Sequence, residues 1–244
     1  MEVERNMEQR TNSCVRRAVE LLAIDSPSGY TRQAAEHVMG AYEAMGLRPE
    51  MTRKGGVMVC LNPEAPAEDG LLLEAHLDTL GAMVSEISGS GRLHLTSLGG
   101  MQPNNGEAEN VRIVTRSGKI YTGTFQLKNA STHVNGEYAS TKREYKTMEV
   151  VIDEEVSSRE DVEKLGIMTG DVVCFDPRTV VTPSGYIKSR FLDDKLSAAI
   201  LLELAAQVAS GEIKPKRRVW EHITVFEEVG HGGSASVPEG VTEA

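Results

Sequence analysis

The strongest constraint on the fold of this chain is that its secondary-structure pattern changes twice. Apolar residues recur every three or four positions over residues 8–23 and 34–45, which predicts two amphipathic helices, and Gly70 opens the apolar run LLLEAH, typical of a covered strand. Between residues 83 and 180, short β-rich pieces such as RLHLTSL, KIYTGTFQ and DVVCF are separated by glycine-containing turns. After Gly185 helix and strand patterns return with LSAAILLELAA and VWEHITVF. This order predicts an α/β domain into which a mostly β domain is inserted.

The changes of pattern also predict the domain bounds. We expect residues 1–84 to form the first part of the α/β domain, residues 85–180 the inserted β-rich domain, and residues 181–244 the second, incomplete part of the α/β domain.

Four local features add further expectations. The segment from Ser157 to Glu160 is typical of a capping box that opens a helix ending at Gly166. The helix over 196–206 is apolar nearly all round, so we expect it to be buried. Lys195, just before it, is in a position where a lysine is more often solvated than in contact with substrate. The residues from His231 onward are expected to be loop.

The composition excludes several classes of function. The 244 residues include 26 Lys and Arg against 36 Asp and Glu, a net charge of −10 that argues against binding nucleic acid or membrane surfaces. No apolar run approaches the roughly 18 residues of a membrane span, and the polar start MEVERNMEQRTNS is not a signal peptide. The basic run KPKRR lacks interleaved aromatic residues, so it does not indicate a nucleic-acid binding site. Because Cys14, Cys60 and Cys174 form no CxxC motif, we expect a reducing, cytoplasmic setting.

The first candidate for chemistry is the segment AHLD at the end of the apolar strand. Residues i and i+2 of a strand face the same side, so His76 and Asp78 are expected to lie together. A carboxylate beside an imidazole can accept its second N–H and strengthen the other nitrogen as a metal ligand. A surface histidine followed by a turn-forming aspartate is the alternative, and for this motif alone it is the commoner case.

Two pairs of adjacent carboxylates form the other candidates. Asp193 and Asp194 precede the apolar helix, where a single aspartate would suffice as an N-cap. Glu227 and Glu228 end a strand before a glycine-rich turn, which would allow both carboxylates to reach one site. One such carboxylate can bind a metal ion while the other acts as general base. The alternatives are a helix cap for the first pair and a solvated acidic loop for the second.

Considered together, the three motifs favour a hydrolytic metal centre. Each motif lies at the end of a predicted strand of the α/β domain or in the connection that follows it, which is where open α/β sheets bind ligands. Imidazole and carboxylates without cysteine are the ligands of hydrolytic zinc, cobalt or manganese centres, and a shared carboxylate holds two ions about 3.5–4 Å apart. The sequence therefore predicts a dinuclear hydrolase.

The segments AHLDTLGAMV, SRFLDDK and VFEEVGHGG, in this order around a β-rich insertion, resemble the TET-type glutamyl or deblocking aminopeptidases, a family of dinuclear metallopeptidases. The resemblance implies a peptidase domain with a mixed sheet flanked by helices, interrupted by an inserted β-barrel-like domain. It implies that His76 and Glu228 each bind a metal ion and that Asp193 bridges the two ions. It further implies that Asp78 orients His76 and that Glu227 is the general base.

The same resemblance sets expectations about activity and assembly. It implies removal of N-terminal residues from peptide substrates with two divalent ions, zinc or cobalt and conceivably manganese. It also implies a homo-oligomer in which residues 85–180 make subunit (dimerisation) contacts. The family takes two further ligands, an aspartate soon after the EE motif and a histidine near the C terminus, and neither has an evident counterpart before Ala244. His231 is the histidine nearest the motif.

Because of these missing ligands, the chain is expected to be a C-terminally truncated peptidase that by itself holds metal weakly or not at all and is inactive. Two alternatives to the aminopeptidase remain at this point. One is a related metal-dependent deacylase acting on an N-acyl amino acid or sugar. The other is a truncated, non-catalytic assembly protein whose insertion mediates association.

Overall fold

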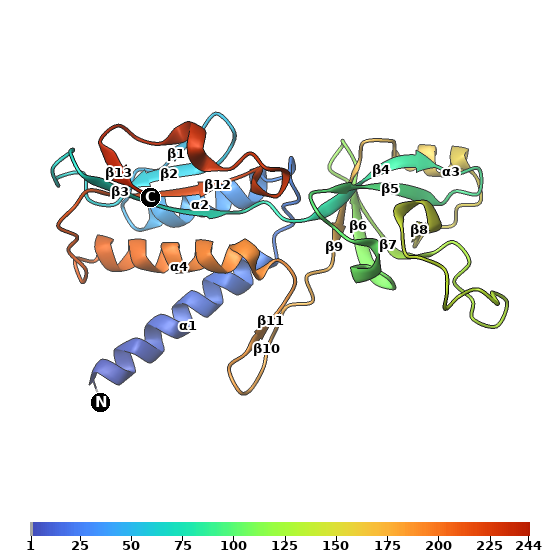
Figure 1. The fold of residues 1–244 in the computed structure, drawn as a ribbon, viewed down its shortest axis with the longest axis horizontal. Helices are drawn as coiled ribbons and strands as arrows, with labels where there is room; N and C mark the ends of the chain where they lie inside the picture. The colour runs from blue at the N-terminus through green and yellow to red at the C-terminus, as the bar shows by residue number, and fades with distance from the viewer. Residues whose placement is uncertain (1) are drawn as a thin grey trace. The chain divides into compact units, whose positions relative to one another are not determined.

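The computed structural model describes residues 2–244, which form two compact units. The first unit comprises residues 2–79 and 177–244, and the second comprises residues 80–176. The first is a mixed sheet packed by helices, and the second is a closed barrel of antiparallel strands (Figure 1). This arrangement confirms the fold class predicted from the sequence, a mixed α/β sheet interrupted by an inserted barrel.

The sheet of the first unit has the strand order β1-β2-β12-β3-β13. Strand β3 pairs in parallel with β12 and β13, whereas β2 pairs antiparallel with β1 and β12. The strand bounds are β1 Glu50–Met51, β2 Val57–Cys60, β3 Gly70–His76, β12 Val219–Thr224 and β13 Val241–Glu243. Because β3 and β12 run in the same direction, their carboxyl ends lie at the same edge of the sheet, which is where ligands bind in open α/β sheets.

Three helices pack on one face of this sheet: α1 Glu2–Leu22, α2 Arg32–Ala44 and α4 Leu192–Ala209 (Figure 1). They bury apolar side chains at helical spacing against β2, β3 and β12. The buried core consists of Ala18, Leu21, Ala34, Ala35, Val38, Tyr42, Val57, Val59, Leu61, Ala75, Leu77, Ala198, Ala199, Leu202, Ala205, Val219, Ile223 and Val225. Since side chains alternate along a strand, the polar residues His76 and Asp78 point to the opposite face.

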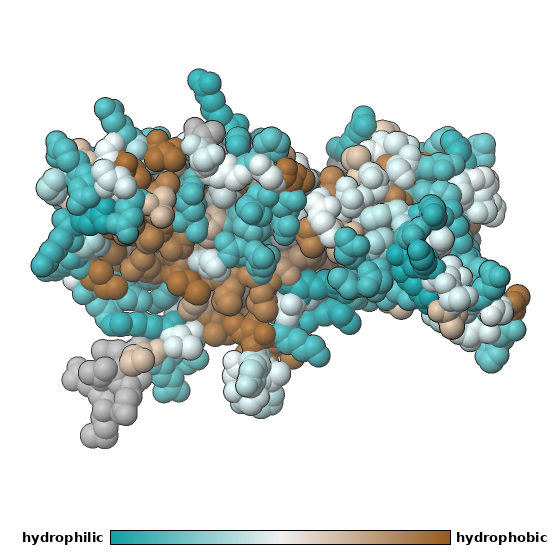
Figure 2. Space-filling model, in the orientation of Figure 1, coloured by the Kyte–Doolittle hydropathy of each residue, from teal (hydrophilic) through white to brown (hydrophobic). Residues whose placement is uncertain are grey.

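Helix α4 differs from its prediction in one respect. Ala198, Ala199 and Leu202 are buried as expected, but Ile200 is 51% exposed. Figure 2 shows apolar side chains gathered over this helix. The prediction of burial all round is therefore wrong for one side of α4, because α1, α2 and β3 contact only part of its circumference.

The second unit is a barrel in the order β4-β5-β8-β7-β6-β9. Side chains along its strands alternate between the interior and solvent, and Phe125 packs edge-on against Phe175 inside. The elements are β4 Gly81–Ile87, β5 Leu93–Leu98, η1 Pro103–Asn105, β6 Glu109–Val114, β7 Ile120–Leu127, η2 Tyr145–Thr147, β8 Met148–Ile152, α3 Arg159–Lys164 and β9 Val172–Phe175. A short hairpin of the first unit, β10 Val180–Val181 and β11 Ile187–Lys188, follows the barrel.

The predicted helix forms, as α3, but its cap lies one residue later than predicted, and the box of Ser157 with Glu160 does not form. Ser158 is the N-cap of α3, and its Oγ accepts a hydrogen bond from the Asp161 amide. The carboxylate that bonds back is that of Asp161 and not Glu160, and it accepts from the amide of Ser157, which precedes the cap, and from the hydroxyl of Ser158.

Two expectations about the first unit are wrong. The residues after His231 are not all loop, since they include the turn η4 Gly233–Ser236 and the strand β13, whose three residues are too few to show a period in the sequence. Lys195 is not solvated but 1% exposed, and its ammonium group donates to the carbonyl oxygens of Leu21 and Ile24. A cation is favourable at that position because the carbonyl oxygens at and just after the C-terminal end of α1 carry partial negative charge.

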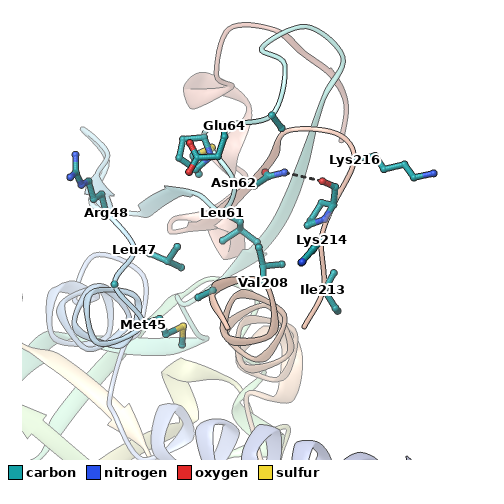
Figure 3. A pocket seen from close by; sticks show the side chains of 16 residues that line it. Met45, Leu47, Arg48, Leu61, Asn62, Glu64, Val208, Ile213, Lys214 and Lys216 are labelled. Atoms are coloured by element: carbon teal, nitrogen blue, oxygen red, sulfur yellow. Dashed lines mark hydrogen bonds between the residues drawn. The ribbon is translucent and has the colours of Figure 1, made fainter. Parts of the chain in front are cut away.

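The basic run KPKRR has a structural use in this unit. Arg218 donates to the carbonyl oxygens of Pro63 and Ala65, and Arg217 pairs with Asp69, so both arginines fix the loop that leads into β3. Lys214 and Lys216 belong to the rim of a groove whose floor is apolar (Figure 3). Among the helices that the structure describes, none has the length and apolar composition that crossing a membrane requires.

A polar pair is buried on the helix side of the sheet. The Tyr42 hydroxyl donates to Glu221 Oε2 over 2.8 Å, and both residues are inaccessible to solvent. Glu221 Oε1 is buried without a hydrogen-bond partner. Burial raises the pKa of Glu221 to about 8, although the hydrogen bond from Tyr42 opposes this effect. The folded unit therefore favours the protonated acid at this position.

This pair predicts a pH-dependent stability. Because the folded-state pKa of Glu221 lies above its ordinary value of 4.5, the folded state binds the proton more tightly, and stability is lost as the pH rises from 4.5 towards 8. We expect the unfolding free energy of the unaltered chain to fall by roughly 1–3 kcal/mol relative to Glu221→Gln over this interval. Urea unfolding followed by the fluorescence of Trp220, the single tryptophan, measures the difference. Parallel pH profiles for the two proteins would contradict it.

Candidate functional site

The three motifs selected from the sequence meet at one edge of the sheet in the first unit. Strands β3 and β12 are in register with His76 opposite Thr224, so the residues that follow each strand are neighbours. The turn η3, Glu227–Val229, comes after β12, and Asp193 and Asp194 come from the start of α4. Side chains from all three segments line a pocket of about 420 Å³.

His76 stands at the centre of this group. Its Nδ1 lies 2.9 Å from the carbonyl oxygen of Asp78, which can only accept, so Nδ1 carries a hydrogen and donates. Its Nε2 lies 3.2 Å from Asp193 Oδ1 and 3.5 Å from Glu227 Oε2. The backbone N–H of His76 donates to Asp194 Oδ2 over 3.2 Å. The nitrogen that would bind a ligand therefore faces two carboxylates.

The His76 imidazole carries a proton readily in these surroundings. Burial lowers its pKa, but hydrogen bonding to Asp78 and the negative charges of Asp78 and Asp194 outweigh burial and raise the pKa to about 9. The anionic setting favours any cation at Nε2, whether this is a proton or a metal ion.

Asp78 is fully buried and connects three segments of the chain. Its carboxylate accepts from Ser28 Oγ over 2.6 Å and from the backbone N–H groups of Glu227 and Glu228 over 3.1 and 3.2 Å. Burial would raise the pKa of Asp78, but His76, Ser28 and these two amides more than offset it and lower the pKa. Successive amides at the start of a turn form a ready site for an anion. Asp78 therefore fixes the Glu227–Glu228 turn as well as His76.

The two glutamates of η3 differ in exposure. The Glu227 side chain is 53% exposed and lines the pocket, whereas Glu228 is partly buried. Burial raises the pKa of Glu228; the charge on His76 opposes the rise, and the neighbouring carboxylates add to it. The Asp193 side chain is 91% exposed. Of the five residues selected from the sequence, His76, Asp193 and Glu227 line the pocket. Asp78 accepts from the η3 amides, and the Glu228 side chain is not among the described residues that line the pocket.

The donor set can be compared with the requirements of a metal ion. Zinc bonds of about 2.0–2.2 Å that meet at a tetrahedral angle separate neighbouring donor atoms by roughly 3.3 Å. The separations of 3.2 and 3.5 Å from His76 Nε2 match this value. Within residues 2–244, however, no three His, Cys, Asp or Glu side chains converge as a metal-binding group. The described residues thus fit part of the coordination of an ion and do not complete it.

Some residues of the site were not selected from the sequence. Ser28, in the SPSG turn, is one, because nothing local shows that its hydroxyl reaches Asp78. Glu74 and His222 are two others; they form a hydrogen-bonded pair beside the pocket, and Glu74 lines it. His231, the histidine closest to the EE motif in sequence, is exposed and does not line the pocket, and its carbonyl oxygen accepts from Lys54.

The fold and the site together define the class of the protein as an α/β domain that is interrupted by a barrel and carries a histidine and carboxylates at one edge of its sheet. Comparison with known families places this architecture in a family. Residues 55–244 match the family model of the M42 glutamyl aminopeptidases. The chain belongs to the M42 glutamyl aminopeptidase family.

Individual relatives give the extent of the similarity. The chain is 39% identical over 224 residues to YhfE of Bacillus subtilis, covering 92% of this chain and 64% of that protein. It is 24% identical over 209 residues to the lysyl aminopeptidase of Pyrococcus furiosus, covering 80% of this chain and 58% of that protein. The solved structure of the Pyrococcus horikoshii TET1 peptidase has the same fold, with a TM-score of 0.75 and 23% identity. This match covers 89% of this chain and 62% of the TET1 chain. The chain therefore spans less than two thirds of the length of each.

The contacts of Asp78 predict the effect of replacing it. Asp78→Asn removes the charge that the Ser28 hydroxyl and the two amides stabilise, and it points an amide group at N–H donors. We expect a loss of roughly 1–3 kcal/mol in the unfolding free energy of the first unit, measured by urea unfolding with Trp220 fluorescence. Asp153→Asn, at an exposed position in the barrel, is the matched control. A loss no larger than that of the control would show that these hydrogen bonds do not stabilise the unit.

Proposed function

We propose that the protein is a metal-dependent aminopeptidase, which hydrolyses N-terminal residues from peptides. The observation that carries the proposal is that His76 Nε2 faces Asp193 Oδ1 at 3.2 Å and Glu227 Oε2 at 3.5 Å in the pocket at the ends of β3 and β12. Membership of the M42 family supports it. In this proposal His76, Asp193 and Glu228 would be the residues that hold two divalent ions, zinc or cobalt, with manganese as the alternative, and Asp193 would serve both ions.

The ions, when bound, would lower the pKa of water and polarise the scissile carbonyl group. The residues of the chain have separate tasks. Asp78 keeps the hydrogen of His76 on Nδ1, which leaves the lone pair of Nε2 directed at Asp193 and Glu227. Asp194 fixes the end of β3 through the His76 amide. Glu227, exposed in the pocket, takes a proton from the attacking water and delivers it to the leaving amine.

Assembly and location are also part of the proposal. We place the subunit contacts of a homo-oligomer on the inserted β-rich domain, residues 85–180, with the α/β domain formed by residues 1–84 and 181–244. The TET1 peptidase of Pyrococcus horikoshii assembles into a tetrahedron or a large octahedral shell, which supports oligomerisation. The cytoplasm suits the three free cysteines, Cys14, Cys60 and Cys174.

A second candidate, a non-catalytic assembly protein, is favoured by one observation. The part of the chain that the structure describes does not complete a metal-binding group, and an ion with few protein ligands is weakly held. Metal analysis after dialysis against zinc, cobalt or manganese at micromolar concentration separates the two candidates. Retention of an ion supports the aminopeptidase, and its absence supports the assembly protein.

Two substitutions test the assigned roles. Glu227→Gln should lower the rate of hydrolysis of aminoacyl p-nitroanilides by a factor of about 10² or more, because the general base is lost. The metal content should stay unchanged. Asp193→Asn should reduce the metal content itself, because a shared ligand is lost. Glu239→Gln, at an exposed position in the same segment, is the control for both. Turnover by Glu227→Gln at the rate of the control would overturn the assignment of the base.

A further inference from the structure

The barrel unit contains two asparagine–glycine pairs, Asn105-Gly106 and Asn135-Gly136, and both lie in connections between its strands. The side-chain amide of an asparagine can react with the backbone nitrogen of the residue that follows it. Glycine hinders this reaction least, because it has no Cβ and its backbone turns freely. On local sequence alone the two pairs are therefore equivalent, but the structure gives them different surroundings.

The first pair is held within a packed turn. Asn105 ends the turn η1, and the Gly106 amide donates to the carbonyl oxygen of Pro103 over 3.0 Å. Gly106 is buried, and a Cβ at this position would lie 2.7 Å from the ring of Phe175 and 3.1 Å from the ring of Phe125. The nitrogen that would have to attack the Asn105 side chain is thus hydrogen-bonded, and the close packing leaves its backbone little room to turn.

The second pair lies in the largely exposed connection between β7 and η2, which extends away from the barrel strands (Figure 1). Among the hydrogen bonds of residues 2–244, none is donated by the Gly136 amide. The Asn135 side chain is folded back over the backbone, since its Oδ1 accepts from the Glu137 amide over 3.0 Å. An N–H group that donates to this oxygen also stabilises negative charge that develops on it. The attacking nitrogen is thus free, and the amide it would attack is polarised.

We propose that Asn135 is a site of spontaneous deamidation and that Asn105 is protected from it, an inference independent of the proposed catalytic function. The Gly136 nitrogen gives up its proton to hydroxide and forms a bond to Asn135 Cγ, whose oxygen the Glu137 amide stabilises. The Cγ–Nδ2 bond then breaks, and the nitrogen takes a proton from water and leaves as ammonia. A second water opens the succinimide ring, so asparagine and water become ammonia and either aspartate or isoaspartate.

The product changes the contacts of this connection. Asn135 Nδ2 donates to the carbonyl oxygen of Asn129 over 2.8 Å, and a carboxylate in its place would bring two acceptors together. Deamidation therefore removes this hydrogen bond and adds one negative charge to a chain whose net charge is −10. The ion pair between Arg143 and Glu107, nearer the other end of the connection, does not involve the reacting groups.

The experiment follows both asparagines at mildly alkaline pH, in the folded chain and in the chain unfolded with guanidinium chloride. Trypsin separates the two sites into the peptides 93–112 and 129–142, and mass spectrometry with chromatographic separation of isoaspartate gives the rate at each site. In the folded chain we expect Asn135 to react roughly tenfold or more faster than Asn105, because reaction at Asn105 must first break a hydrogen bond and loosen a packed turn. In the unfolded chain the two rates should be similar.

A substitution of the attacking residue tests the assigned step. The space around Gly136 is open and its φ lies outside the left-handed region, so Gly136→Ala is compatible with the fold. Its methyl group hinders the approach of the nitrogen and should lower the rate at Asn135 several-fold. Gly100→Ala, at another exposed glycine of the barrel unit with open space, is the matched control and should leave that rate unchanged.

Three results would overturn the proposal. The first is equal rates at Asn105 and Asn135 in the folded chain. The second is reaction of Asn135 only after unfolding, because the hydrogen bonds of its side chain would then be protective. The third is a rate at Asn135 that is the same in Gly136→Ala and in the control, since the glycine nitrogen would then not be the attacking group.

Discussion

The candidate site depends on the hydrogen bonds to the buried carboxylate of Asp78. Ser28 Oγ and the amides of Glu227 and Glu228 converge on it, and the His76 imidazole lies against it. A buried carboxylate is costly unless donors surround it, so burial of Asp78 requires these segments to be in place together. The early turn, the end of β3 and the turn after β12 are tied by one charged group.

With Asp78 satisfied in this way, negative charge accumulates on the open side of the site. Asp193, Glu227 and Glu74 all face one pocket, and like charges at such distances repel. Water solvates the exposed carboxylates and weakens this repulsion, and a bound cation would reduce it further. Glu221, the buried acid on the other face of the sheet, is in a different environment. Among the contacts described, no cation pairs with it, and Tyr42 donates a hydrogen bond to it. Burial favours the protonated form of Glu221. The first unit thus carries acidic groups in two electrostatic settings, one in the pocket and one in the core between sheet and helices.

Most of the fold could be predicted because its signals are local. The helices α1, α2 and α4, the strands β3 and β12, and barrel strands such as β5, β7 and β9 follow from spacing and turn residues that a window of ten residues contains. The failures have physical reasons. Strand β13 is too short to show a period, the exposed side of α4 depends on what packs there, and Lys195 is buried because the distant end of α1 offers carbonyl groups to it.

The sequence by itself determined the alternation of α/β and β segments, the acidic character, and the three motifs at strand ends that resemble a metallopeptidase. It could not determine that Ser28 and Asp78 bond across 50 residues, that Glu74 faces His222, or which nitrogen of His76 is directed at Asp193. Strand order and register decided these contacts. Pairing between strands far apart in the chain depends on the packing of the whole sheet, whereas periodicity reports only which face of an element is apolar.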